Sequence, residues 1–86
     1  MTNLYNPTSK IIRKPDVIYM TGFSKSTLYN RIKSGIFPPP ISLGARAVGF
    51  VQAECDSVLA AMIAGKSPSQ IKALVEELIT QRHKEK

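Results

Sequence analysis

The sequence is poor in the residues that build redox, metal and membrane sites. Its one cysteine, Cys55, excludes an intramolecular disulfide, and Cys55 with the one histidine, His83, does not make a metal-ligand cluster. No long apolar run is present, and the N-terminal segment MTNLYNPTSK lacks the apolar core of a signal peptide. These absences predict a soluble protein of a reducing cytoplasm, with no membrane association.

The motifs of phosphate-binding and hydrolytic enzymes are also missing. The glycines on either side of Arg46, in GARAVG, lack the spacing of a P-loop and the Lys-Ser/Thr that ends one. Solvation on a helix face explains Glu76 and Glu77 better than a catalytic pair does, and His83 has no serine near it in sequence. A chain of 86 residues makes one domain with a modest core, not a domain with an enclosed active site. We therefore expect neither an enzyme nor a cofactor.

Acidic side chains are scarce in the first part of the chain, and the net charge lies there. The chain carries 12 Lys and Arg against 6 Asp and Glu, a net charge of +6. Residues 1–51 hold seven basic side chains and one acid, Asp16, whereas residues 52–86 hold five of each sign. A basic half of this kind is typical of a protein that faces a polyanion such as nucleic acid. The alternative is a solvated, lysine-rich surface.

A tight corner between two short helices is predicted around TGFSKS. A first helix over about residues 15–20 begins with Pro15, whose missing N–H costs nothing at the first helical position. Gly22 ends this helix in the left-handed conformation. Ser24 then caps a second helix over about residues 24–34, because its hydroxyl can accept from a free N–H of the first turn.

The second helix is predicted to have one buried and one outward face. Leu28 and Ile32, four positions apart, point inward. The outward face has no acidic side chain, and it carries Ser26, Asn30 and Lys33, flanked by Thr27 and Tyr29. Such polar groups on a short second helix, after a glycine corner, are what a helix needs to read the major groove of DNA.

A proline block and a hairpin are predicted to follow. Residues 38–40 are three prolines, which suit an extended connector and neither a helix nor a central strand. Residues 41–43 and 48–51 then form the strands of a β-hairpin, with Arg46 at or beside its tip. An arginine there can reach a phosphate or the minor groove, and the alternative is a plain solvent-exposed turn residue.

Two amphipathic helices complete the chain. The first begins around Gln52 and ends at Gly65. Its predicted buried stripe is Cys55, Val58, Leu59, Met62 and Ile63. On this stripe Cys55 is expected to be a core residue and not a nucleophile.

The last helix opens with SPSQ, in which Ser67 and Gln70 fit a capping box. Its stripe is Ile71, Leu74, Val75, Leu78 and Ile79. This stripe fits either the chain's own core or the same helix of a second copy, and the pattern does not separate the two. The charged end RHKEK is expected to fray.

The run from Arg13 to about Leu59 resembles the AlpA family of small prophage-encoded transcriptional regulators, relatives of MerR-like and excisionase-like DNA binders. The likeness is carried by Arg13, by the corner TGFSKSTLY, by the break GIFPPP and by the hairpin segment RAVGF. Three departures stand out. Asn30 replaces the family's arginine after the tyrosine, Phe50 replaces a tryptophan, and Val58 replaces a second tryptophan often found in the following helix.

The resemblance implies a mainly α fold with a small β-hairpin, a winged helix-turn-helix with four helices. The DNA-binding domain would be residues 11–65. Outside the part that carries the resemblance, the polar start predicts a flexible N-terminal tail over residues 1–10, and the last apolar stripe predicts a C-terminal amphipathic helix over residues 66–86 that packs on the core or in a dimer. The resemblance also implies a sequence-specific regulator of prophage or genomic-island genes, often an activator of an integrase gene or a promoter of excision. The protein would then be cytoplasmic, in a bacterium, and associated with the nucleoid.

The outward face and the hairpin hold the expected DNA contacts. Base-edge or near-base contacts are assigned to Lys25, Ser26, Tyr29 and Asn30. Phosphate contacts are assigned to Thr27, Arg31, Lys33 and Arg46, and Ser24 would share its capping role with a phosphate at the helix start. The alternatives are a Tyr29 that braces the hairpin and a Lys33 that is only solvated.

Two rival functions remain open at this point. One is an excisionase-like factor that bends DNA and recruits a recombinase. The other is a protein-interaction module without specific DNA binding, in which the helix from Ser67 to Arg82 packs on a partner; the same helix could also pair two copies of the chain in a homodimer. RNA binding is disfavoured, because no aromatic pair is expected on a sheet face.

Overall fold

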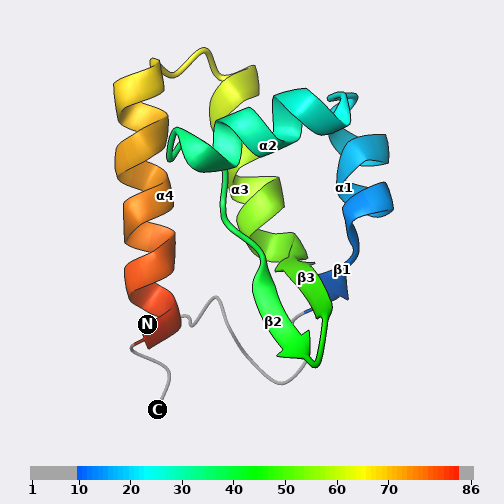
Figure 1. Cartoon of the computed structure of the whole chain (residues 1–86). Coiled ribbons are helices and arrows are strands. Elements are labelled where there is room, and N and C mark those ends of the chain that lie inside the picture. The colour runs from blue at the N-terminus through cyan, green and yellow to red at the C-terminus, as the bar shows by residue number, and fades with distance from the viewer. Residues whose placement is uncertain (1–9, 84–86) are drawn as a thin grey trace.

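The computed structural model describes residues 10–83, and Figure 1 shows the helices packed side by side with a small sheet at one end of the molecule. The elements, in chain order, are β1 (Ile11–Ile12), α1 (Lys14–Thr21), α2 (Lys25–Lys33), β2 (Ile41–Gly44), β3 (Ala47–Val51), α3 (Gln52–Ile63) and α4 (Pro68–His83). This arrangement confirms the predicted fold class, a mainly α domain of four helices with a β-hairpin. The flexible tail expected over residues 1–10 lies, apart from Lys10, outside the described residues.

The helix-turn-helix corner has the predicted local structure. Gly22 has a φ of 75°, the left-handed conformation, and its N–H donates to the carbonyl of Ile18 at the end of α1. Ser24 lies before α2 with extended backbone, and its Oγ accepts from the N–H of Thr27 at 3.1 Å. α1 is a little longer than predicted, because the Arg13 N–H donates to the Asp16 carboxylate and fixes an earlier start.

The hairpin is part of a three-stranded antiparallel sheet in the order β1-β3-β2. β2 and β3 form the predicted hairpin, and Ala45 and Arg46 make its turn. β1 was not predicted, since two residues are too short for a periodic pattern; Ile11 and Ile12 lie opposite Val51 and Phe50. Gly49 leaves room for side chains of both neighbouring strands, because a Cβ there would lie 2.6 Å from the Ile11 side chain and 2.9 Å from that of Leu43.

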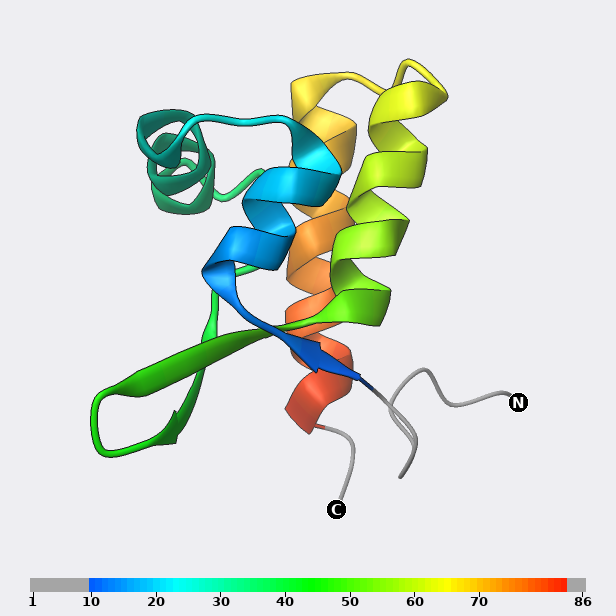
Figure 2. The same ribbon diagram turned by 90° about the vertical axis from the view of Figure 1, so that its right-hand side faces the viewer.

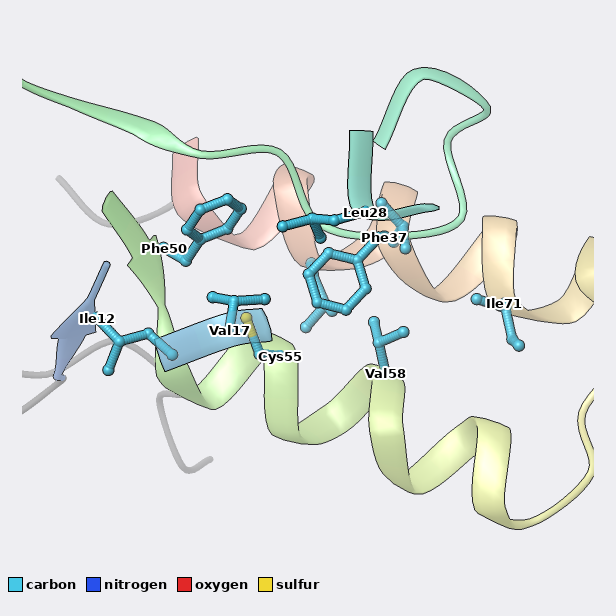
Figure 3. Close-up of a cluster of buried hydrophobic side chains, with 10 residues drawn as sticks. Ile12, Val17, Leu28, Phe37, Phe50, Cys55, Val58 and Ile71 are labelled. Atoms are coloured by element: carbon cyan, nitrogen blue, oxygen red, sulfur yellow. The ribbon is translucent and has the colours of Figure 1, made fainter. Parts of the chain in front are cut away.

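One core joins the sheet to all four helices, as Figure 3 shows for part of it. Phe37 and Phe50, from the connector and β3, are its largest fully buried side chains, and Leu28 of α2 packs with them. The buried positions are confirmed for Leu28, Cys55 and Val58. In α4, the stripe residues Ile71, Val75 and Leu78 are buried in this same core, so the chain itself covers them.

Two predictions for the C-terminal half are wrong. Ile63 is 86% exposed, because at about 100° per residue it lies at the edge of the α3 stripe and in the last turn, where the chain leaves the core. Arg82 and His83 do not fray but lie in the last turn of α4, and Arg82 is held by Glu54. The rest of the predicted frayed end, residues 84–86, lies outside the described residues.

Candidate nucleic-acid interface

The outward face of α2 is polar, basic and open to solvent, as predicted. Lys25, Ser26, Asn30 and Lys33 are all exposed, and Tyr29 is 65% exposed. No side chain of α2 is acidic. A negatively charged ligand that approaches this face therefore meets hydroxyl, amide and ammonium groups and no carboxylate of the helix.

The first turn of α2 is held by a hydroxyl pair. Ser24 Oγ accepts from the Thr27 N–H and donates to Thr27 Oγ1 at 2.9 Å. Since Thr27 Oγ1 is the acceptor in this bond, its own proton remains available for an external acceptor such as a phosphate oxygen. The free N–H groups of the first turn and the helix dipole add to the attraction for an anion there.

Arg31 stacks on the ring of Phe23, a contact that the sequence did not predict. Its guanidinium carbon lies 4.8 Å from the ring centroid of Phe23, and the side chain is half-buried. A guanidinium stacked on an aromatic face keeps its N–H edge free for hydrogen bonds. Arg31 thus remains a donor at the flank of α2 while its orientation is restricted.

The hairpin turn lies on the same side of the molecule as α2. Figure 2 shows both projecting to one side, while α3 lies on the opposite side. Arg46 is exposed in the turn between β2 and β3. The structure therefore brings all nine of the sequence-predicted contact residues to two neighbouring elements, α2 with its cap and the hairpin.

A groove of about 200 Å³ separates α2 from the hairpin. Tyr29 of α2 and Val48 and Phe50 of β3 line it, and Lys14 and Lys25 contribute the basic part of its lining. A second, more open hollow of about 480 Å³ lies between α1 and the start of α2, and the same two lysines line it too. The ring of Tyr29 thus lies beside the hairpin and is also largely open to solvent.

Lys14 is a residue of this surface that sequence reasoning missed. It was counted in the basic half of the chain but was given no role, because it precedes the predicted first helix. Its place next to Lys25 depends on how α1 packs against α2. The available clue was the pair Arg13-Lys14 directly before a helix-turn-helix corner.

Cys55 is a buried core residue, and the described part of the chain holds no cluster of metal-ligating side chains. Burial, together with the nearby carboxylates of Glu54 and Asp56, raises the pKa of the Cys55 thiol from 9.0 to about 12. The thiol therefore stays protonated, as a core residue does. Residues 10–83 contain no group of three or more His, Cys, Asp or Glu that could hold a metal ion. None of the four helices is long and apolar enough to cross a membrane.

Comparison with known proteins identifies the family of this chain. A protein of Enterobacteria phage P4, "Uncharacterized protein ORF88", is 39% identical over 57 residues, 66% of this chain and 65% of the relative. The chain thus spans slightly less than two thirds of the length of that relative. No solved structure matches the chain. The family model described as "Prophage CP4-57 regulatory protein (AlpA)" matches residues 10–61, from β1 through most of α3. The chain belongs to the AlpA family of prophage regulatory proteins.

Proposed function

We propose that the protein is a sequence-specific DNA-binding transcriptional regulator, encoded by a prophage or genomic island. α2 lies in the major groove, and the hairpin places Arg46 on the backbone or in the minor groove. The observation that carries the proposal is the acid-free outward face of α2 on the same side of the molecule as Arg46. Membership of a family of prophage regulators supports it.

Base contacts come from the exposed side chains of α2 in this arrangement. Lys25 and Ser26 lie in the first turn, which enters the groove first, and Asn30 has an amide that can pair bidentately with adenine. Tyr29 completes the set of base contacts from the side of α2 that faces the hairpin. A helix of nine residues reads few base pairs, so useful specificity requires a dimer or tandem sites.

Phosphate contacts come from the flanks of this surface. Thr27 and Ser24 offer a hydroxyl and N–H groups at the start of α2, and Arg31 and Lys33 offer cations toward its end. Arg46 offers a cation from the hairpin. Such contacts fix the register of the protein on the duplex without reading the sequence.

The test is affinity for a duplex from the gene neighbourhood and for a scrambled duplex, each at two salt concentrations. A preference of about a hundredfold that survives the higher salt, with both affinities falling as roughly 4 to 6 phosphate contacts require, would support the proposal. Equal, weak binding to both duplexes that vanishes with salt would refute it and leave the charge of residues 1–51 as a solubilising surface.

An excisionase-like role in DNA bending is the second candidate, with a recombinase as partner. The hairpin favours it, because Leu43 and Val48 are apolar yet 42% and 43% exposed beside the Arg46 turn. Apolar side chains that press into a minor groove unstack base steps and bend the duplex. A bend measured by circular permutation of the binding site, lost in Leu43→Ser, separates this role from simple regulation.

Pairing of two copies through the helix from Ser67 to Arg82 would need a different face of that helix from the one expected. Ile71, Val75 and Leu78 of the apolar stripe are buried in the chain's own core, and Leu74 and Ile79 are half-buried against it. The face of α4 that stays exposed includes Ala73, Glu76, Glu77 and Thr80. An interaction module built on the apolar stripe has the same difficulty. Sedimentation of the protein with and without the specific duplex decides whether two copies form on DNA.

A further inference from the structure

Arg82, in the last turn of α4, joins two segments that are far apart in sequence. Its Nε donates to Glu54 Oε2 at 2.6 Å, and its Nη2 donates to Glu54 Oε1 and to the carbonyl oxygen of Pro39 at 2.8 Å. Glu54 is fully buried, and the Arg82 side chain is 17% exposed. The arrangement is thus a buried, bidentate ion pair with an additional bond to the backbone.

The two bonded segments lie at the base of the hairpin, where the chain enters β2 and where it leaves β3; we call them the roots of the hairpin. Pro39 lies in the connector that leads from α2 into β2, and Glu54 lies in the first turn of α3, which follows β3 directly. One guanidinium therefore holds the chain where it enters the hairpin and where it leaves it. The hairpin tip with Arg46 projects away from this point (Figure 2), so a small tilt at the roots moves the tip farther.

The connector of three prolines can take part in hydrogen bonds only as an acceptor. Prolines have no N–H, so residues 38–40 cannot tie themselves to the sheet or to a helix by donating a backbone hydrogen bond. Phe37 and Pro38 are buried, and the bond from Arg82 adds a directional contact at the next residue. Only arginine presents several donors in a fixed plane, which is what two carboxylate oxygens and a carbonyl require together.

The donor and its acceptors differ in their relation to the family. The family match covers residues 10–61, which include Pro39 and Glu54, and it ends before α4.

We propose that Arg82 is a positioning residue for DNA binding: it fixes the roots of the hairpin, so that Arg46 and α2 engage one duplex together. This inference rests on the proposed DNA-binding function.

The first test needs no DNA. Residual dipolar couplings of backbone N–H groups report whether α2 and the hairpin share one orientation frame. In the parent they are expected to fit a single alignment tensor, and in Arg82→Met the hairpin should need a separate one. Arg82→Lys keeps the charge but lacks the planar fork, and it provides a milder variant should Arg82→Met fold poorly. Val75→Ala, a core truncation on the same helix, is the control and should keep the single tensor.

The second test asks whether positioning matters for binding. Arg46→Ala should weaken binding to the specific duplex about tenfold in the parent and in Val75→Ala, but about twofold or less in Arg82→Lys. An equal loss in all three backgrounds, or a single tensor in both Arg82 variants, would overturn the inference. If the parent shows no preference for the specific duplex, the proposed function fails, and the dipolar couplings still decide whether Arg82 orients the hairpin.

Discussion

Phe23 joins Arg31 of the proposed recognition helix to the core. The ring of Phe23 lies under the Arg31 guanidinium on one side and meets Phe37 edge-on, with ring centroids 6.0 Å apart and an interplanar angle of 72°. Phe37 is fully buried. A side chain expected to touch phosphate is therefore oriented through two aromatic contacts, and the corner residue between α1 and α2 has a role beyond filling space.

A double-mutant cycle measures this link. Phe23→Leu and Arg31→Ala should each lower the free energy of unfolding, and the double variant should lose less than their sum by about 0.5–1 kcal/mol, the strength of an exposed cation–π contact. Urea unfolding of the four proteins gives this coupling. Additivity within about 0.3 kcal/mol would mean that the stacked geometry contributes nothing to stability.

Ser26→Glu should abolish specific DNA binding and leave the fold intact. Ser26 is exposed in the first turn of α2, where an acid is compatible with the helix dipole but would put a negative charge against the duplex. Ser69→Glu is a matched control, because Ser69 is exposed at the equivalent position in the first turn of α4. Titration of a labelled duplex should show loss for the first variant and parental affinity for the second. If Ser26→Glu binds the duplex as tightly as the parent does, α2 does not lie in the major groove.

The sequence predicted those parts of the fold that depend on neighbouring residues. Gly22 and Ser24 form the corner, and Ser67 and Gln70 form the capping box at the start of α4, with the Gln70 side chain accepting from the Ser67 N–H at 2.8 Å. The outward face of α2 was predictable for the same reason, since helical periodicity alone separates it from Leu28.

Contacts between distant residues could not be read in this way. Glu54 and Arg82 are 28 positions apart, and nothing local in either segment indicates that a carboxylate of α3 will be buried. The pairing of β1 with β3, and the presence of Lys14 and Lys25 on the lining of the same groove, also depend on how distant parts of the chain pack. The candidate site was therefore predictable on α2 and at the hairpin turn, and incomplete where α1 approaches them.

Lys14→Ala should reduce the salt dependence of DNA binding. Lys14 and Lys25 line the same two hollows beside α2, so a duplex whose bases Lys25 contacts brings a backbone phosphate within reach of Lys14. Loss of one phosphate contact lowers the slope of log K against log salt by about 1 and weakens specific and scrambled duplexes alike. Lys66→Ala, in the exposed loop between α3 and α4, removes the same charge elsewhere and should keep the parental slope. An unchanged slope for Lys14→Ala would place the phosphates away from α1.

Cys55 should make the stability of the protein fall at alkaline pH. Burial, with the carboxylates of Glu54 and Asp56, raises the pKa of its thiol from 9.0 to about 12. Above pH 9.0 the unfolded chain releases the thiol proton while the folded chain keeps it, so rising pH favours unfolding until the folded thiol also ionises near pH 12. The effect amounts to at most about 1.4 kcal/mol for each pH unit in that window.

The measurement is the difference in free energy of unfolding between the parent and Cys55→Ala, taken by urea unfolding at about pH 8 and about pH 10.5. All other side chains are the same in the two proteins, so their contributions cancel in the difference. At pH 8 Cys55→Ala should have a lower free energy of unfolding than the parent, because it leaves a small cavity in the core. This deficit relative to the parent should shrink as the pH rises. A deficit that stays constant would mean that the thiol ionises equally in the folded and unfolded chains, and that the site beside Glu54 admits water.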